Sequence, residues 1–318
     1  MTVVFAGAGA SAVGRAARLA VDLLRLAPEY DGGRRRHARE LHVIEAWNER
    51  QAIGPVALEA WFSELQASDD PRDLALFHDL AALIAHNLAQ DMAHTRNYRT
   101  QFTTLTKIAG STQVPDQENL WTTLGAIPHL AVVTTNYDII IERGLRFKPT
   151  RRSPGFHYGI VGERLEGALF RGHGQDTSTS GRVPLYKLHG SLSWSLAPGG
   201  RIMRYVDCRP AITGRAFIVP PVREKPVAPR GLEHVWSGAA SVLAAARRLI
   251  VIGYSAPEYD WAVRDLLARH LTSTARVDVF NLYPEEAETY RRLLPGRTVE
   301  FHGPLPAGLP VLRELACA

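Results

Sequence analysis

The chain has 318 residues, of which 46% are hydrophobic and 22% charged, and its 37 basic and 32 acidic residues give a formal net charge of +5. This is the composition of a globular protein with one elaborated domain or two, and it gives no reason to expect a disordered chain. Two cysteines, Cys208 and Cys317, are too few for a disulfide framework or a four-cysteine zinc site, and no apolar run approaches the roughly 20 residues that a membrane-spanning helix needs.

The N-terminal residues predict a strand, a glycine turn and a helix, in that order. Val3–Ala6 is a short apolar run, Gly7-Ala8-Gly9 forms the turn, and apolar residues from Ala16 to Leu24 mark the helix. The strand begins without a basic leader, so we expect a cytoplasmic protein. Glycines in such a turn let a phosphate approach the backbone, and the start of the helix attracts its charge. We therefore predict nucleotide contacts from Gly7, Ala8, Gly9 and Ser11.

This glycine motif is weak evidence when taken alone. Ala12 stands where the dinucleotide fingerprint has its third small residue, so Gly7 to Ala12 fits only the looser form of that fingerprint. A structural turn that binds nothing is the alternative. Much of the excess positive charge follows at Arg34 to Arg39. A solvated loop is the commoner meaning of such a cluster, and nucleic-acid binding is the lesser alternative, which would weaken steeply with added salt.

Residues 36–108 have the spacing of amphipathic helices. Their apolar residues recur mostly at three- and four-residue intervals: Leu41, Ile44, Trp61, Leu65, Leu76, Leu80, Leu83, Ile84 and Leu88. We predict an inserted helical module over 36–108, with a Rossmann-like domain over 1–35 and 109–318. Homo-oligomerisation through this module is a hypothesis. His78, His86 and His94 recur every eight residues without cysteine partners, which favours a helix face over a metal site, and we predict no metal.

The rest of the chain alternates strands with helices. Buried strands are expected over 129–133, 184–188, 216–219, 249–252 and 277–280, with an edge strand over 298–301 and helices over 236–247, 261–270 and 284–294. Alternation of this kind indicates a parallel α/β sheet with right-handed crossovers and helices on both faces. The fold class predicted is therefore α/β, a Rossmann-like parallel sheet with a helical insertion module.

Polar motifs follow several of these strands, where doubly wound sheets bind their ligands. Asn136 follows the second strand, His189 follows the strand at 184–188, and Gly253-Tyr254-Ser255 follows 249–252. Asn281 ends another strand, and its amide suits a ribose hydroxyl. We predict a nucleotide site that includes Gly253, Ser255 and Asn281, and the Asn and His suggest chemistry on the nucleotide itself.

As a set, these motifs resemble those of bacterial sirtuin-like (silent information regulator-like) NAD-hydrolysing proteins. The order is Gly7-Ala8-Gly9-Ala10-Ser11, Thr135-Asn136-Tyr137-Asp138, Lys187-Leu188-His189-Gly190-Ser191, Pro220-Pro221 with Lys225, Trp236 leading into a helix, and Ile252-Gly253-Tyr254-Ser255 with Asp260. The resemblance implies a Rossmann-like NAD domain, NAD as substrate, and a role as an effector in anti-phage defence. The chain departs from the deacylating sirtuins because it lacks four zinc cysteines and their Gly-Ile-Pro-x-Phe-Arg segment, which counts against peptide deacylation.

The chemistry implied is cleavage of the bond between nicotinamide and ribose. This reaction passes through an oxocarbenium-like ribosyl cation, and its leaving group is already cationic, so a base and a positioned water suffice. His189 suits the base, Asn136 suits the group that holds water or a ribose hydroxyl, and Asp138 is a candidate to stabilise positive charge. Asp138 equally suits a helix cap.

Two rival hypotheses remain open. A non-catalytic sensor would bind NAD or ADP-ribose and contact a partner through its helical module, and a transferase would pass ADP-ribose or acyl groups to another molecule. For the leading hypothesis, an NAD glycohydrolase, we expect a separate activating protein to relieve inhibition.

Overall fold

The computed structural model describes residues 1–12, 38–54, 56–94, 120–145, 155–158, 183–196, 202–204, 216–220, 222 and 231–317. The helix predicted from Ala16 to Leu24, the basic cluster at Arg34 to Arg36, and Lys225 lie outside these residues. None of the described helices has both the length and the apolar character needed to cross a membrane.

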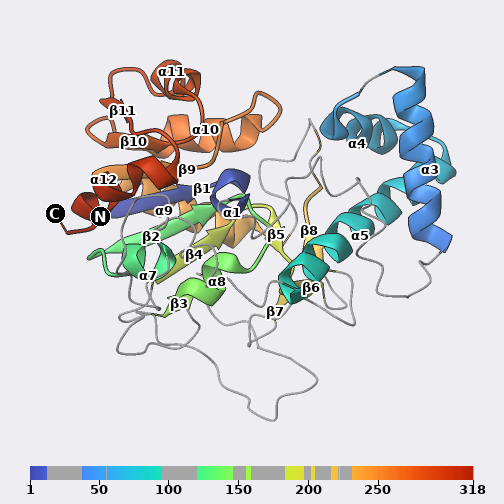
Figure 1. Ribbon diagram of the computed structural model, residues 1–318, viewed down its shortest axis with the longest axis horizontal. Helices are drawn as coiled ribbons and strands as arrows, with labels where there is room; N and C mark the ends of the chain where they lie inside the picture. Colours follow the sequence, from blue (N-terminus) through green and yellow to red (C-terminus); the bar gives the residue numbers. More distant parts are fainter. Residues whose placement is uncertain are drawn as a thin grey trace, which may run out of the picture.

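Seven parallel strands form the main sheet, in the order β11-β10-β9-β1-β2-β4-β3 (Figure 1). They are β1 (Thr2–Ala6), β2 (Leu130–Thr134), β3 (Phe156–His157), β4 (Val183–Lys187), β9 (Arg248–Ile252), β10 (Arg276–Phe280) and β11 (Val299–Phe301). The parallel sheet predicted from alternating strands and helices is confirmed, and β11 lies at the edge as predicted.

The topology of the sheet reverses beside β1. After β1 the chain proceeds to β2 and β4 on one side, whereas after β9 it proceeds to β10 and β11 on the other. The carboxyl ends of β1 and β9 are paired side by side, and the connections that leave them run to opposite sides of the sheet. In open α/β sheets such a switch point is where ligands bind.

Helices cover both faces of the sheet, as predicted. Tyr186 and Val279 share one face through the register of the strands, and Phe280 points to the opposite face. Helix α9 (Glu233–Ala244) packs on the first face, where a Cβ added at Gly238 would lie 2.3 Å from the ring of Tyr186. Helix α12 (Leu305–Cys317) packs on the second face, where a Cβ added at Gly308 would lie 2.6 Å from the ring of Phe280.

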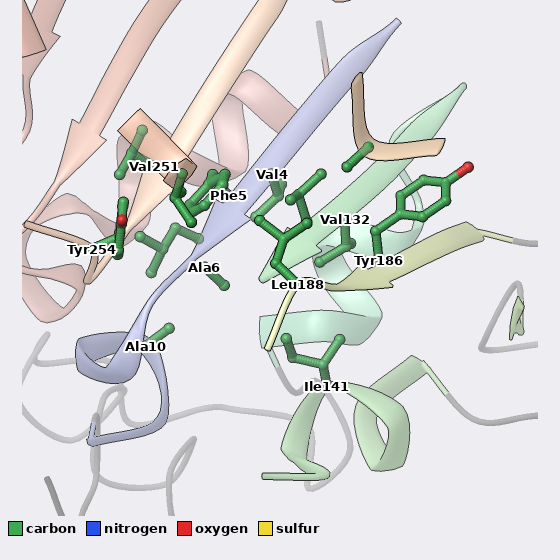
Figure 2. Close-up of a cluster of buried hydrophobic side chains, with 14 of the residues drawn as sticks. Val4, Phe5, Ala6, Ala10, Val132, Ile141, Tyr186, Leu188, Val251 and Tyr254 are labelled. Carbon is green, nitrogen blue, oxygen red and sulfur yellow. The ribbon is translucent and has the colours of Figure 1, made fainter. Parts of the chain in front are cut away.

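The core is apolar along whole strands rather than at alternate positions. Val3 to Ala6 of β1 are fully buried, since the central strand is covered on both faces. Figure 2 shows Val4, Phe5 and Ala6 surrounded by side chains from neighbouring strands, including Val132 and Val251. Burying an aliphatic or aromatic side chain of this size contributes about 1.5–3 kcal/mol to stability.

Four other helices of the described part of the chain accompany the sheet. They are α7 (Leu120–Gly125), α8 (Ile140–Leu145), α10 (Trp261–His270) and α11 (Pro284–Leu293), while the glycine turn leads into a short helix, α1 (Ala8–Ala12). Tyr290 of α11 donates its hydroxyl to the backbone oxygen of Tyr254, at 2.9 Å, and so anchors the turn after β9. The helices predicted over 236–247, 261–270 and 284–294 therefore exist, with small differences at their ends.

Within the segment predicted to be an insertion, the described residues form three helices: α3 (Ala38–Ile53), α4 (Leu58–Ala67) and α5 (Pro71–His94). Helices α3 and α4 both pack on α5, beyond the carboxyl ends of the strands in Figure 1. Aromatic pairs such as Phe62 with Phe77, at 5.5 Å between ring centroids, hold them together. Leu41, expected on the apolar face, is 45% exposed, because Val43 occupies the buried position of that turn. The division into two domains remains a prediction.

One strand expected in the parallel sheet belongs elsewhere. Residues 216–219 contain β8 (Phe217–Ile218), which pairs antiparallel with β5 (Gly190–Ser191). A second antiparallel pair joins β6 (Trp194–Leu196) to β7 (Ile202–Arg204). Gly190 has φ +83° and approaches so closely that an added Cβ would lie 2.2 Å from the carbonyl oxygen of Phe217. Pieces this short show no period in the sequence, so pattern alone did not assign them.

Candidate functional site

Parallel strands bring the predicted motifs to one edge of the sheet. Gly7 follows β1, Asn136 follows β2, His189 follows β4, Gly253 follows β9 and Asn281 follows β10. Because these five strands are all parallel neighbours, their carboxyl ends lie at the same edge. In the sequence each of these residues directly follows a buried strand, and the parallel sheet then brings the five motifs together in space.

The two glycine turns pack directly on each other at the switch point. The backbone N–H of Gly9 donates to the carbonyl of Gly253, at 2.9 Å, and that of Gly7 donates to the carbonyl of Ile252, also at 2.9 Å. An added Cβ at Gly253 would lie 2.2 Å from the backbone nitrogen of Ala10. Glycine is required here for backbone packing, which is the structural alternative left open above, and phosphate binding by these turns remains a prediction.

We expect Gly253→Ala to lower the free energy of unfolding by about 2–5 kcal/mol. The residue has φ +63°, which costs a non-glycine residue about 1–2 kcal/mol, and the clash with the first turn adds about 1–3 kcal/mol. Gly296→Ala is the matched control, because Gly296 has φ +79° with nothing within 4 Å. Urea unfolding should give a loss of only about 1–2 kcal/mol for this control. Equal losses in both variants would contradict the tight packing of the turns.

The other predicted nucleotide contacts stay predictions. Ala8 and Ser255 are exposed at the same edge, and Ser11 lies in α1, where its side chain is outside the described residues. Asn281 is buried, with 8% exposure, and its Oδ1 accepts from the N–H of Leu282 at 3.2 Å. Its Nδ2 has no hydrogen-bond partner among the described residues, so it offers a donor at the strand end.

Asn136 is fixed to the first glycine turn. Its Nδ2 donates to the carbonyl oxygen of Gly7 at 2.8 Å, and the residue is buried, with 6% of its surface exposed. Thr134 supports it from below, because the Thr134 hydroxyl accepts from the backbone N–H of Asn136 at 3.1 Å and donates to the carbonyl of Ala6 at 2.8 Å. The carboxamide therefore has one preferred orientation.

Backbone hydrogen bonds hold the loops of Asn136 and His189 side by side. Leu188 donates to the carbonyl of Thr134 at 2.9 Å, and Leu192 donates to the carbonyl of Tyr137 at 2.8 Å. These bonds flank Asn136 on one loop and His189 on the other. The two residues predicted as catalytic thus occupy adjacent, mutually bonded loops.

His189 faces a carboxylate that was not among the predicted site residues. Its Nε2 lies 3.4 Å from Oδ1 of Asp260, and both residues are almost fully buried, with 3% and 2% exposure. The other oxygen of Asp260 accepts from the hydroxyl of Tyr254 at 2.8 Å. Burial is the main cause that raises the pKa of Tyr254 well above its usual value, with the charge of Asp260 second, so this phenol remains a donor at physiological pH.

A tyrosine also borders the imidazole. The ring centroids of Tyr137 and His189 are 6.4 Å apart, and the Tyr137 hydroxyl donates to the carbonyl of Val219 at 2.5 Å. Burial raises the pKa of Tyr137 far above its usual value. The backbone of Val219 in turn donates to the carbonyl of His189 at 2.8 Å, which ties the antiparallel β5–β8 piece to the site.

Asp138 makes the capping contact that the sequence left as an alternative. Its Oδ1 accepts from the backbone N–H of Ile140, at 3.0 Å, at the start of α8. The residue is 4% exposed, and the carbonyl oxygen of its backbone accepts from the ammonium of Lys187. A catalytic role for Asp138 remains a prediction beside this structural one.

A fully buried ion pair supports the same loop from inside. The Nζ of Lys187 lies 2.8 Å from Oε1 of Glu142, and neither side chain is accessible to solvent. The hydroxyl of Tyr158 also donates to Oε1 of Glu142, at 3.1 Å. Since Lys187 also binds the backbone at Asp138, the pair connects β4, α8 and the loop of Asn136.

Among the described residues, one group has the arrangement of metal ligands. The ligand atoms of Asp278, Glu300 and His302 lie within 4.8 Å of one another. The Nε of Arg248 lies 3.6 Å from Oδ2 of Asp278, and Nη2 of Arg276 lies 2.7 Å from Oε1 of Glu300. Arginine side chains therefore already balance the negative charge of both carboxylates. The absence of a metal therefore stays a prediction.

The chain belongs to the SIR2-like family. The model of the SIR2-like domain matches residues 130–301, which is more than half of the chain. The resemblance inferred from the ordered motifs is confirmed. The motif after β9 included Asp260, but sequence reasoning assigned this residue no role in the site. Its position at the start of α10, with Oδ1 3.4 Å from Nε2 of His189, is what marks it.

Solved structures of Sir2 proteins are similar over nearly the whole chain. A structure described in a study of the mechanism and regulation of Sir2 enzymes has 15% identity and a TM-score of 0.36, with 99% of this chain and 92% of that chain covered. A Sir2 homologue in complex with NAD has 15% identity and a TM-score of 0.38, with 99% and 88% covered. Sir2Tm bound to a propionylated peptide has 12% identity and a TM-score of 0.38, with 99% and 91% covered. A search of curated proteins finds no match to the chain.

Proposed function

We propose that the protein is an NAD glycohydrolase, which cleaves NAD into nicotinamide and ADP-ribose or a cyclic product. The observation that carries this proposal is the pairing of loops that holds Asn136 and His189 together at the carboxyl edge of the sheet. Membership of the SIR2-like family supports it, and one Sir2 homologue is described in complex with NAD. NAD enters as the substrate.

In this proposal the residues divide the chemistry between them. His189 takes a proton from a ribose hydroxyl or from water as positive charge develops on the ribosyl carbon. Asn136, held by Gly7, orients the attacking water or a ribose hydroxyl through its carboxamide. Asp138 would stabilise the ribosyl cation by charge, and the buried amide of Asn281 would donate to the adenosine ribose.

The helical segment supplies a route for regulation. The hydroxyl of Tyr259 donates to Oε1 of Glu59 in α4, at 3.3 Å, and Tyr259 directly precedes Asp260. A protein that binds α3 to α5 would therefore act on the loop that carries the partner of His189. We propose a cytoplasmic anti-phage effector that an activating protein, or assembly of several copies, switches on.

Incubation with NAD tests the activity. Purified full-length protein, alone and with the product of the neighbouring gene, should release nicotinamide together with ADP-ribose or its cyclic form, detected by chromatography and mass spectrometry. Tight NAD binding by calorimetry without cleavage under both conditions would contradict the proposal and support a sensor. Transfer of label from NAD to another molecule would contradict hydrolysis and support a transferase.

A further inference from the structure

We propose that Asp260 is a positioning residue, which holds His189 in the tautomer that has its proton on Nε2 and so makes Nδ1 the basic nitrogen. This inference rests on the proposed function, because it names the group that makes His189 a base. It starts from the 3.4 Å separation of His189 Nε2 and Asp260 Oδ1. The two atoms are at ion-pair distance, and the contact is not a hydrogen bond in this structure. Hydrogen bonds between catalytic groups are often long or poorly aligned before substrate binds, and they tighten in the reacting complex.

The ordinary structural reason for an aspartate at this position does not apply. Asp260 is the N-cap of α10, where an aspartate usually accepts from the first backbone N–H groups of the helix. Its side chain makes no such capping bond, although its backbone carbonyl accepts from Val263 and Arg264. The carboxylate turns instead toward the tyrosine of the glycine turn and toward the imidazole.

Tyr254 sets the direction of that carboxylate. Its hydroxyl donates to Oδ2 at 2.8 Å, while its ring packs on Phe5 with 4.8 Å between centroids. Tyr290 fixes its backbone from α11. With Oδ2 engaged by a rigid donor, Oδ1 is the oxygen that faces His189.

The proton inventory follows from this geometry. A carboxylate accepts only, so once this contact shortens to a hydrogen bond the nitrogen facing Asp260 carries the proton, and the lone pair then lies on Nδ1. When Nδ1 takes a proton from the ribose hydroxyl or water, the oxygen keeps the electron pair and the ring becomes an imidazolium. Asp260 stays ionised and stabilises that cation, as the aspartate of a serine-protease triad does.

Asp260→Asn provides the direct test. Asparagine has nearly the same size and shape as aspartate, and the side chain makes no capping bond that could be lost, so the fold should survive. Because the Tyr254 hydroxyl must keep an acceptor, the amide carbonyl should stay at Tyr254 and the NH₂ should face His189. An NH₂ donor at that position requires Nε2 to accept, so Nε2 loses its proton and the neutral imidazole carries its proton on Nδ1 instead. Asp278→Asn is the matched control, since Asp278 is also a buried aspartate, 2.8 Å from His302, in β10.

Two measurements read the outcome in the full-length protein. Long-range ¹H–¹⁵N spectra of ¹⁵N-histidine-labelled protein, assigned with His189→Ala, should give the Nε2–H tautomer for His189 in the wild type and in Asp278→Asn, and the Nδ1–H tautomer in Asp260→Asn. For nicotinamide release, Asp260→Asn should lower kcat by about 10²–10⁴-fold with KM changed less than about twofold. Asp278→Asn should keep both constants near wild type.

The results that overturn the proposal are equally specific. A wild-type His189 protonated on Nδ1, or an unchanged tautomer in Asp260→Asn, would overturn it. So would an active wild type in which Asp260→Asn and Asp278→Asn have equal kcat. If the wild type does not cleave NAD, that result would count against the proposed glycohydrolase. The tautomer measurement would still decide the role of Asp260.

Discussion

Replacing His189 with alanine should lower the rate of nicotinamide release by about 10²–10⁴-fold, because the base that accepts the proton is removed. Asn136→Ala should reduce the rate as well, and it should also cost about 1 kcal/mol of stability because the bond from Nδ2 to the carbonyl of Gly7 is lost. Single-turnover assays of nicotinamide release measure the first effect, and urea unfolding measures the second.

His302→Ala is the control for His189→Ala. His302 is also largely buried and also pairs with an aspartate, but it lies beyond β11, at the edge strand of the sheet. Its removal should leave the rate of nicotinamide release within about twofold of wild type, since general acid–base catalysis requires contact with the reacting group. Turnover that persists in both His189→Ala and Asn136→Ala would dismiss the glycohydrolase.

Breaking the buried ion pair should produce the largest loss of stability. Lys187→Met leaves the carboxylate of Glu142 buried without its cation, and such changes cost about 3–5 kcal/mol. That is a large share of the roughly 5–15 kcal/mol that stabilises a typical domain. Activity should fall too, because Lys187 also binds the backbone carbonyl of Asp138 in the loop of Asn136.

A double variant separates the lost charge from the lost packing. Lys187→Met with Glu142→Gln removes both charges and leaves Tyr158 a neutral acceptor. It should recover about 2 kcal/mol relative to Lys187→Met, because no unpaired charge stays buried. Urea unfolding of the three proteins measures this, and a single variant that loses under about 1 kcal/mol would show that the pair contributes little.

Secondary structure was predictable where the chain buries whole strands. In β1, β9 and β10 nearly continuous apolar runs end at glycine or asparagine, a pattern that parallel sheets require because both faces are covered. The short antiparallel pieces β5 to β8 have no such pattern. Their positions depend on close backbone contacts, such as that of Gly190 with Phe217, which no local period records.

The site was partly predictable for the same reason. Asn136 and His189 follow recognisable strands, so their arrival at one edge of the sheet followed from parallel topology. The role of Asp260 did not follow, since an aspartate before a helix is normally a cap and only its actual orientation shows that it is not. The pairing of Lys187 with Glu142 was missed, because a charged residue inside an apolar strand gives no indication of its partner.

By itself, the amino-acid order determined the buried strands, the turns that end them, and membership of the SIR2-like family, because these depend on residues close together in the chain and on the order of motifs. Only the tertiary structure decided which polar groups face one another at the edge of the sheet. The contacts of His189 with Asp260, of Asn136 with Gly7 and of Lys187 with Glu142 join distant segments, and their partners depend on strand register and side-chain direction, which local sequence does not encode.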